Sequence, residues 1–144
     1  MGRREPGRGS DELRGGSAAA PSAPARAGGS PGRHWAEELA EKTLVAKGYE
    51  VLDRNYRLRG GELDLVCRAP DGTVVFVEVR QRRAAGHGGP GESLHAAKLR
   101  RLRRAAAHYL AVALRLPEAR SRFDAVLVAG DRDGPVVRHV EDAF

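Results

Sequence analysis

The 144-residue sequence has one cysteine, Cys67, and no apolar run that approaches the length of a membrane span. A single cysteine excludes an internal disulfide and favours a reducing, cytoplasmic compartment. A membrane-spanning helix needs about 20 apolar residues, so we expect none in this chain. No apolar stretch follows the first arginines either, so we also expect no secretory signal.

Residues 1–31 contain almost no large apolar side chain, with Leu13 as the exception. Glycine, serine, alanine, proline and arginine make up most of this segment. Such a composition cannot bury enough surface to offset the entropy lost on ordering. We therefore predict a disordered tail over 1–31 and a single domain over 32–144, which is long enough for one core around one sheet.

Acidic residues are absent between Ser93 and Pro117, although the net charge of the whole chain is only +6. A one-sided stripe of positive charge favours a polyanionic partner, most commonly nucleic acid, although a solvated helix face is the alternative. Lysine accounts for only three of the 25 cations, a compositional bias that weakens any argument that a given arginine was selected over lysine for its chemistry. The cations of the stripe are Lys98, Arg100, Arg101, Arg103, Arg104 and Arg115.

Hydrophobic periodicity predicts an α/β fold with elements in the order α-β-β-β-α-β-β. A helix with spacings of three and four ends at Gly48, and a longer helix carries an apolar stripe from Leu99 to Leu114. Turn-forming residues separate the strands, and the glycine-rich segment 82–91 predicts a loop. The strands are expected at 49–56, 62–67, 73–80, 122–129 and 136–140.

Three charged residues on two neighbouring strands form the most informative pattern in the chain. Asp64 lies on the first strand, and Glu78 and Arg80 share one face of the second because strand side chains alternate. A carboxylate among the valines of this strand is unfavourable to bury without a partner. A divalent cation, Mg²⁺ or Mn²⁺, shared by Asp64 and Glu78 would be such a partner, and the Val79 carbonyl can supply a third ligand.

This pattern suits phosphodiester hydrolysis, in which magnesium activates water and neutralises the charge on the leaving oxygen. Arg80 would hold the attacking water or stabilise the developing charge, and Glu37 from the first helix would complete the outer shell. The alternative is a solvated face of an edge hairpin, with Glu78 paired to Arg80 and Glu62 beside Asp64. The spacing alone leaves both interpretations open.

Eight motifs in order resemble the YraN-like family of bacterial proteins, from about Arg33 to Phe144. That family is similar in fold to the Holliday-junction resolvases and the restriction-endonuclease-like nucleases. The resemblance implies a mixed central sheet flanked by helices, and resolvases pair as homodimers. The motifs are Ala36-Glu37-x-x-Ala40, Gly48-Tyr49, Arg54-Asn55-Tyr56-Arg57, Gly61-Glu62-Leu63-Asp64, Phe76-Val77-Glu78-Val79-Arg80, Lys98, Arg122-Phe123-Asp124 and Ala143-Phe144.

The resemblance also implies roles for individual positions. Glu37 takes the place of the helix acid, Asp64 that of the first strand ligand and Glu78 that of the second. Arg80 stands where nuclease relatives generally have lysine, and arginine can stabilise charge but cannot exchange a proton as lysine can. Lys98, near the start of the basic helix, is the candidate substitute for that lysine.

We therefore predict a nucleic-acid-binding protein, and the first interpretation is a metal-dependent endonuclease acting on DNA, including branched or damaged DNA. The second is a catalytically inactive nucleic-acid-binding module on the same scaffold, and the third is an adaptor for an acidic protein. Two of the candidate phosphate contacts, Asn55 and Arg57, have a structural turn role as their alternative. The candidate contacts are Asn55, Arg57, Arg82, Arg83, Lys98 and Arg101.

Overall fold

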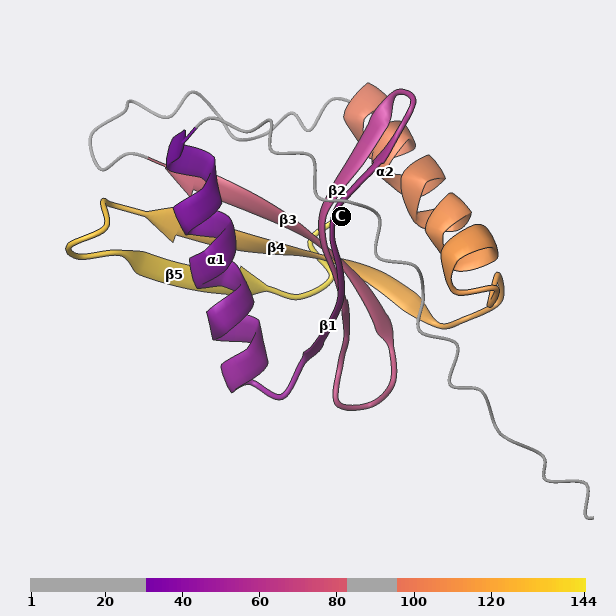
Figure 1. The fold of residues 1–144 in the computed structure, drawn as a ribbon, viewed down its shortest axis with the longest axis horizontal. Coiled ribbons are helices and arrows are strands. Elements are labelled where there is room, and N and C mark those ends of the chain that lie inside the picture. Colours follow the sequence, from indigo (N-terminus) through magenta and orange to yellow (C-terminus); the bar gives the residue numbers. More distant parts are fainter. Residues whose placement is uncertain (1–30, 83–95) are drawn as a thin grey trace, which may run out of the picture.

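The computed structural model describes residues 31–82 and 96–144, which form a five-stranded mixed sheet and two helices (Figure 1). Residues 1–30 of the predicted tail and most of the predicted glycine-rich loop lie outside these residues, whereas Pro31, predicted as the end of the tail, is the first residue of the first helix. The order α-β-β-β-α-β-β is as predicted, and the α/β, restriction-endonuclease-like class is confirmed. The elements are α1 (Pro31–Ala46), β1 (Glu50–Leu58), β2 (Gly61–Arg68), β3 (Val74–Arg82), α2 (Ala96–His108) with the π-helical turn η1 (Tyr109–Ala113), β4 (Ser121–Ala129) and β5 (Val136–Val140).

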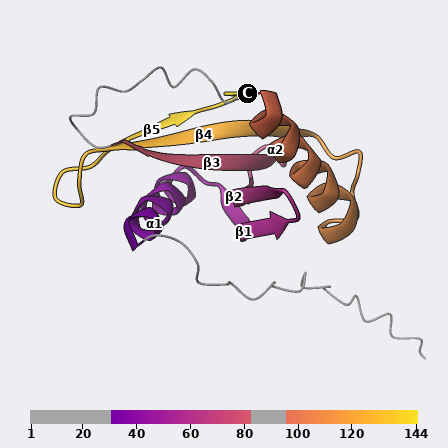
Figure 2. The same ribbon diagram turned by 90° about the horizontal axis from the view of Figure 1, so that it is seen from above.

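The strands lie in the sheet in their order along the chain, β1-β2-β3-β4-β5. Only the β3–β4 pair is parallel, and α2 provides the crossover that a parallel pair requires. The other neighbouring pairs are antiparallel. Figure 2 shows β3, β4 and β5 as one layer, with the β1–β2 hairpin turned away from it.

The turn between β2 and β3 lies where turn-forming residues separate two of the predicted strands. Gly72 has a φ of +89°, a left-handed conformation that glycine adopts without steric cost. The Thr73 backbone N–H donates to Asp71 Oδ1 at 3.0 Å, and the Gly72 N–H donates to the Ala69 carbonyl at 2.9 Å. These bonds fix the register in which the two strands carry their acidic residues.

The two faces of β3 contribute to different hydrophobic clusters. Val75, Val77 and Val79 pack in the cluster that includes α1, whereas Phe76 packs in the cluster that includes α2. The strand alternation then assigns Glu78, two residues after Phe76, to the α2 side. Glu78 is therefore the acidic residue of an otherwise apolar buried strand, as the sequence predicted.

The second helix buries the middle of the predicted stripe, whereas Leu99, Ala113 and Leu114 at its ends are only partly buried. Leu102, Tyr109 and Leu110 are buried as expected, and Ala105 is buried beside them. Cys67 is fully buried in the α1-side cluster. Within the described residues, no helix combines the length and apolar character needed to cross a membrane.

Candidate functional site

Asp64 lies where β2 separates from β3. The paired residues end at Leu65 and Val77, so Asp64 would be next in register with Glu78. Instead of a backbone ladder bond, the Val79 N–H donates to Asp64 Oδ2 at 2.9 Å. The Asp64 side chain is buried, so this carboxylate is held in the sheet against the backbone next to Glu78.

Glu78 is a buried carboxylate between two cations. Its side chain is 8% exposed, Lys98 of α2 contacts Oε1, and Arg80 Nη2 lies 3.7 Å from Oε2. Within the described part of the chain, Oε2 has no hydrogen-bond donor. A solvated position for Glu78 is therefore wrong, whereas the pairing with Arg80 that this alternative included is present. One of the carboxylate oxygens can accept a further ligand.

Arg80 lies between Glu78 and an aromatic ring. Its guanidinium carbon is 5.4 Å from the centre of the Phe144 ring, within the range of a cation–π contact. The same ring lines an apolar hollow next to the Glu78 carboxylate. The other apolar residues that line this hollow are Leu63, Phe76, Val77, Leu102 and Phe123.

Within the described residues, Glu37 does not complete a three-membered metal-holding group with the two strand carboxylates. It is buried on α1, and the neighbouring Ala36 and Ala40 pack on the Val77 side of β3, away from the face of Glu78. Residues 31–82 and 96–144 contain no group of three or more histidine, cysteine or acidic side chains arranged to hold a metal. The role predicted for Glu37 in the outer shell therefore gains no support from this geometry.

Two carboxylates nevertheless suit a hard divalent cation. Mg²⁺ is commonly held by one or two carboxylates and keeps several of its waters, and Mn²⁺ accepts similar oxygen ligands. The buried Oε2 of Glu78, without a hydrogen-bond donor among the described residues, is a fitting ligand atom. Asp64 and Glu78 are thus the residues that could hold the ion, and the Val79 carbonyl stays a predicted third ligand.

The exposed side of α2 is basic along its length. Lys98, Arg100, Arg101, Arg103 and Arg104 are exposed, and no acidic residue occurs in the helix. The tip of the β1–β2 hairpin joins this surface, because Arg104 Nη2 donates to the Arg59 carbonyl at 3.2 Å. We call these five helix residues and Arg59 the basic face.

The predicted phosphate contacts divide into exposed and engaged residues. Arg82 and Arg101 are exposed, whereas Arg83 lies outside the described residues. Arg57 is paired with Glu62 at 3.3 Å across the hairpin, which lowers its availability to phosphate. Asn55 has a φ of +51°, a conformation that asparagine tolerates better than most residues, and this favours its structural alternative.

Lys98 forms an ion pair with Glu78. The contact favours the alternative role predicted for it, as substitute for the lysine that Arg80 replaces. A lysine on a neighbouring helix and an arginine on the strand thus share one carboxylate. Sequence spacing alone could not fix this contact, because it depends on how β3 and α2 pack against each other.

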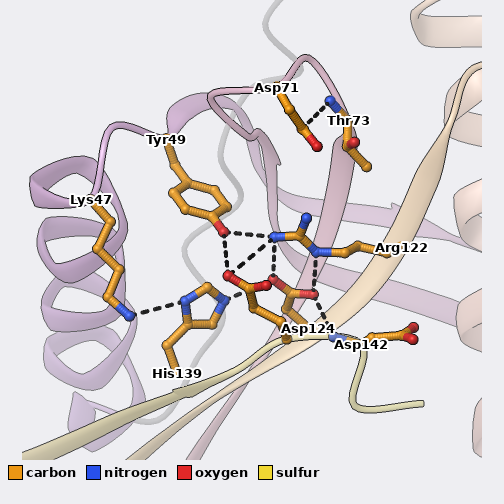
Figure 3. A network of polar contacts seen from close by, with 9 residues as sticks. Lys47, Tyr49, Asp71, Thr73, Arg122, Asp124, His139 and Asp142 are labelled. Atoms are coloured by element: carbon orange, nitrogen blue, oxygen red, sulfur yellow. Dashed lines mark hydrogen bonds and ion pairs between the residues drawn. The ribbon is translucent and has the colours of Figure 1, made fainter.

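A second buried polar network had no role in the sequence prediction (Figure 3). Asp124, on β4, is fully buried and accepts hydrogen bonds from Arg122 Nε at 3.0 Å and His139 Nε2 at 2.7 Å. Arg122 also donates to the Tyr49 hydroxyl at 2.6 Å. The hydrogen bond to Asp124 raises the pKa of Arg122, so its guanidinium stays charged.

The tautomer of His139 follows from its two partners. Nε2 carries the proton that Asp124 accepts, and Nδ1 accepts from Lys47 Nζ at 3.3 Å. The available signal in the sequence was Arg122 and Asp124 two positions apart in an apolar strand, which puts both on one face. We interpret the network as structural, since each Asp124 oxygen has donors.

Comparison with known sequences identifies the family. Residues 36–128 match the profile of the uncharacterised protein family UPF0102. The chain belongs to UPF0102. A UPF0102 protein of Cupriavidus taiwanensis is 54% identical over 97 residues, which cover 67% of this chain and 72% of the relative. One from an Acidovorax strain is 49% identical over 117 residues, covering 78% and 83% respectively. This family is the YraN-like, restriction-endonuclease-like family that the motifs predicted, and its name specifies no activity.

Proposed function

We propose that this UPF0102 protein is a metal-dependent phosphodiesterase that cleaves DNA. The observation that carries the proposal is the environment of Glu78, a carboxylate 8% exposed with Lys98 and Arg80 beside it. A buried charge with an unsatisfied oxygen is unfavourable for stability, so its presence favours a functional role. Asp64, next in register on β2, supplies the second carboxylate.

Each residue of the candidate site would have a separate role in cleavage. Asp64 and Glu78 would hold Mg²⁺ or Mn²⁺, and such an ion supplies activated water and neutralises phosphate charge. Arg80 stays protonated and stabilises the negative charge that develops on the phosphorus oxygens. Lys98 contacts the same carboxylate and, unlike a guanidinium, can give up a proton.

The basic face supports a polyanionic substrate. Its helical residues lie on α2, the element that also brings Lys98 to Glu78. A DNA backbone that follows this surface would therefore pass the two carboxylates. Branched and damaged DNA belong among the substrates to be tested, and so does pairing of two chains as in the resolvases.

A cleavage assay tests the proposal. The purified chain is incubated with duplex, flap, fork, four-way-junction and single-stranded DNA in Mg²⁺ or Mn²⁺. We expect divalent-dependent nicking that disappears in Asp64→Asn and Glu78→Gln while DNA binding persists. Glu62→Gln is the matched control, because it removes a partly exposed carboxylate from β2, the strand that carries Asp64. This variant should cleave normally.

The second candidate function is an inactive nucleic-acid-binding module. It is favoured by the absence of a three-membered acidic or histidine cluster in the described ranges, and by the two cations that already neutralise Glu78. Wild-type protein that binds DNA but cleaves no member of the panel would support this module and contradict the enzyme. DNA binding that does not weaken with salt would contradict both and favour an acidic protein partner.

A further inference from the structure

The segment that follows β5 links the two faces of the sheet. The Asp142 N–H donates to Asp124 Oδ1 at 3.0 Å, and the Ala143 N–H donates to the Phe123 carbonyl at 2.8 Å. Asp142 has a φ of +50°, a conformation that a non-glycine residue adopts at a cost when its surroundings hold it there. We call residues 141–144 the strap.

The strap begins in the buried network and ends at the candidate site. Glu141 accepts a hydrogen bond from the Tyr49 hydroxyl at 3.3 Å, and Tyr49 belongs to the α1-side core. Phe144 instead lines the hollow beside Glu78 and lies under the Arg80 guanidinium. The strap therefore passes from one face of the sheet to the other.

The contact with Phe144 has a consequence for the orientation of Arg80. The Arg80 side chain has several rotatable bonds, and its 3.7 Å approach to Glu78 Oε2 is too long for a hydrogen bond. An ion pair at that distance does not fix the plane of the guanidinium. The Phe144 ring, 5.4 Å from the guanidinium carbon, restricts that plane.

We propose that Phe144 is a positioning residue for Arg80, and that Asp124 holds Phe144 in place from the opposite face of the sheet. The effect on cleavage rests on the proposed function, whereas the effect on Arg80 does not. The network thus acts on the site through the strap. Mutations in the strap will alter the order of Arg80 without touching either carboxylate.

Nuclear magnetic resonance of the arginine side chains tests the positioning without any cleavage assay. The Arg80 signals, assigned with Arg80→Lys, should carry an upfield ring-current shift in the wild type. Phe144→Leu keeps an apolar side chain but removes the ring, and it should abolish the shift, whereas Phe144→Tyr should retain it. An unchanged Arg80 signal in Phe144→Leu would overturn the proposal.

A second variant tests the strap without disturbing the core. Ala143→Pro removes the N–H that donates to Phe123, while the buried Asp124 network keeps its side chains. We expect the Arg80 shift to be lost here as well, with the thermal unfolding transition still cooperative. A folded Ala143→Pro protein with the wild-type Arg80 shift would contradict the role of the strap.

Cleavage kinetics add a readout that a purely structural role would not move. Phe144→Leu should lower kcat about three- to tenfold with KM little changed, since a cation–π contact contributes in that range. Phe144→Tyr should restore kcat. An unchanged kcat in Phe144→Leu would show that the position of Arg80 does not affect catalysis. Absence of cleavage by the wild type would contradict the proposed function alone, because the resonance experiment still tests whether Phe144 positions Arg80.

Discussion

Charge compensation around single residues determines what the candidate site can do. Glu78 has two cationic neighbours of different chemistry, Lys98 from a helix and Arg80 from its own strand. Both neutralise the carboxylate, but only the lysine can exchange a proton with a bound nucleophile. The two cations therefore have separable roles that substitutions can distinguish.

Lys98→Met should lower the rate of cleavage about 100-fold, the scale of a lost proton-transfer group. Lys98→Arg should restore little of that rate, because it returns the charge without the proton. Arg100→Met is the matched control, since it removes an exposed cation from the same helix. Equal losses in Lys98→Met and Arg100→Met, measured as kcat, would mean that Lys98 contributes only general positive charge.

Cys67 gives a prediction about stability and pH. Burial raises the pKa of its thiol from 9.0 to about 12, so the native chain resists its ionisation. This contribution to stability is complete below pH 9 and is lost as the pH rises toward 12, because the unfolded thiol ionises first. Between pH 8 and pH 10, the free energy of unfolding measured in urea should fall by about 1.4 kcal/mol more for the wild type than for Cys67→Ala. An equal fall in the free energy of unfolding for the two proteins would contradict the raised pKa of Cys67.

Among the elements, the close approach of the β1–β2 hairpin to α2 shapes the basic face. A Cβ added at Gly61 would lie 3.0 Å from the Arg101 carbonyl and 3.4 Å from Ala105 Cβ. The absence of a side chain at Gly61 therefore lets the hairpin lie directly on the helix. This contact brings Arg59 next to Arg104.

Gly61→Ala should lower the free energy of unfolding by about 1–2 kcal/mol, because the atom that it meets belongs to a backbone that cannot move freely. Gly134→Ala is the control, since a Cβ there meets nothing within 4 Å. It should change stability by less than about 0.5 kcal/mol. Equal effects of the two substitutions in urea unfolding would show that the hairpin is not packed tightly on α2.

The elements were predictable from the sequence because their signals are local. Valine alternation on β3 and the turn at Gly72 both depend on neighbouring residues, and both were confirmed. The contact between Lys98 and Glu78 and the link between Asp124 and His139 depend on tertiary packing. No local pattern gives the distance between such residues, so these parts of the sites became visible only in the structure.

At the scale of the whole molecule, the described residues place five cations and no acidic residue along α2. Figure 1 shows α2 and the turn between β4 and β5 at opposite ends of the fold. A DNA backbone attracted to α2 would therefore leave the opposite turn uncovered. This asymmetry allows two arginines of similar exposure to be compared.

Arg101→Gln should reduce the slope of log affinity against log salt by about 0.9, as expected for one lost phosphate contact on duplex DNA. Arg132→Gln, in the turn between β4 and β5, should leave the slope unchanged because that residue is exposed far from α2. Fluorescence anisotropy over a series of salt concentrations measures both slopes. Equal changes in the two variants would contradict binding along the basic face.

If Asp64 and Glu78 together hold one divalent ion, calorimetric titration with Mn²⁺ will detect it. Wild-type protein should bind one ion per chain, and Glu62→Gln should bind it equally well. Asp64→Asn and Glu78→Gln should each lose the site while remaining folded. Mn²⁺ binding that is unchanged in Glu78→Gln, or absent from the wild type, would contradict the account.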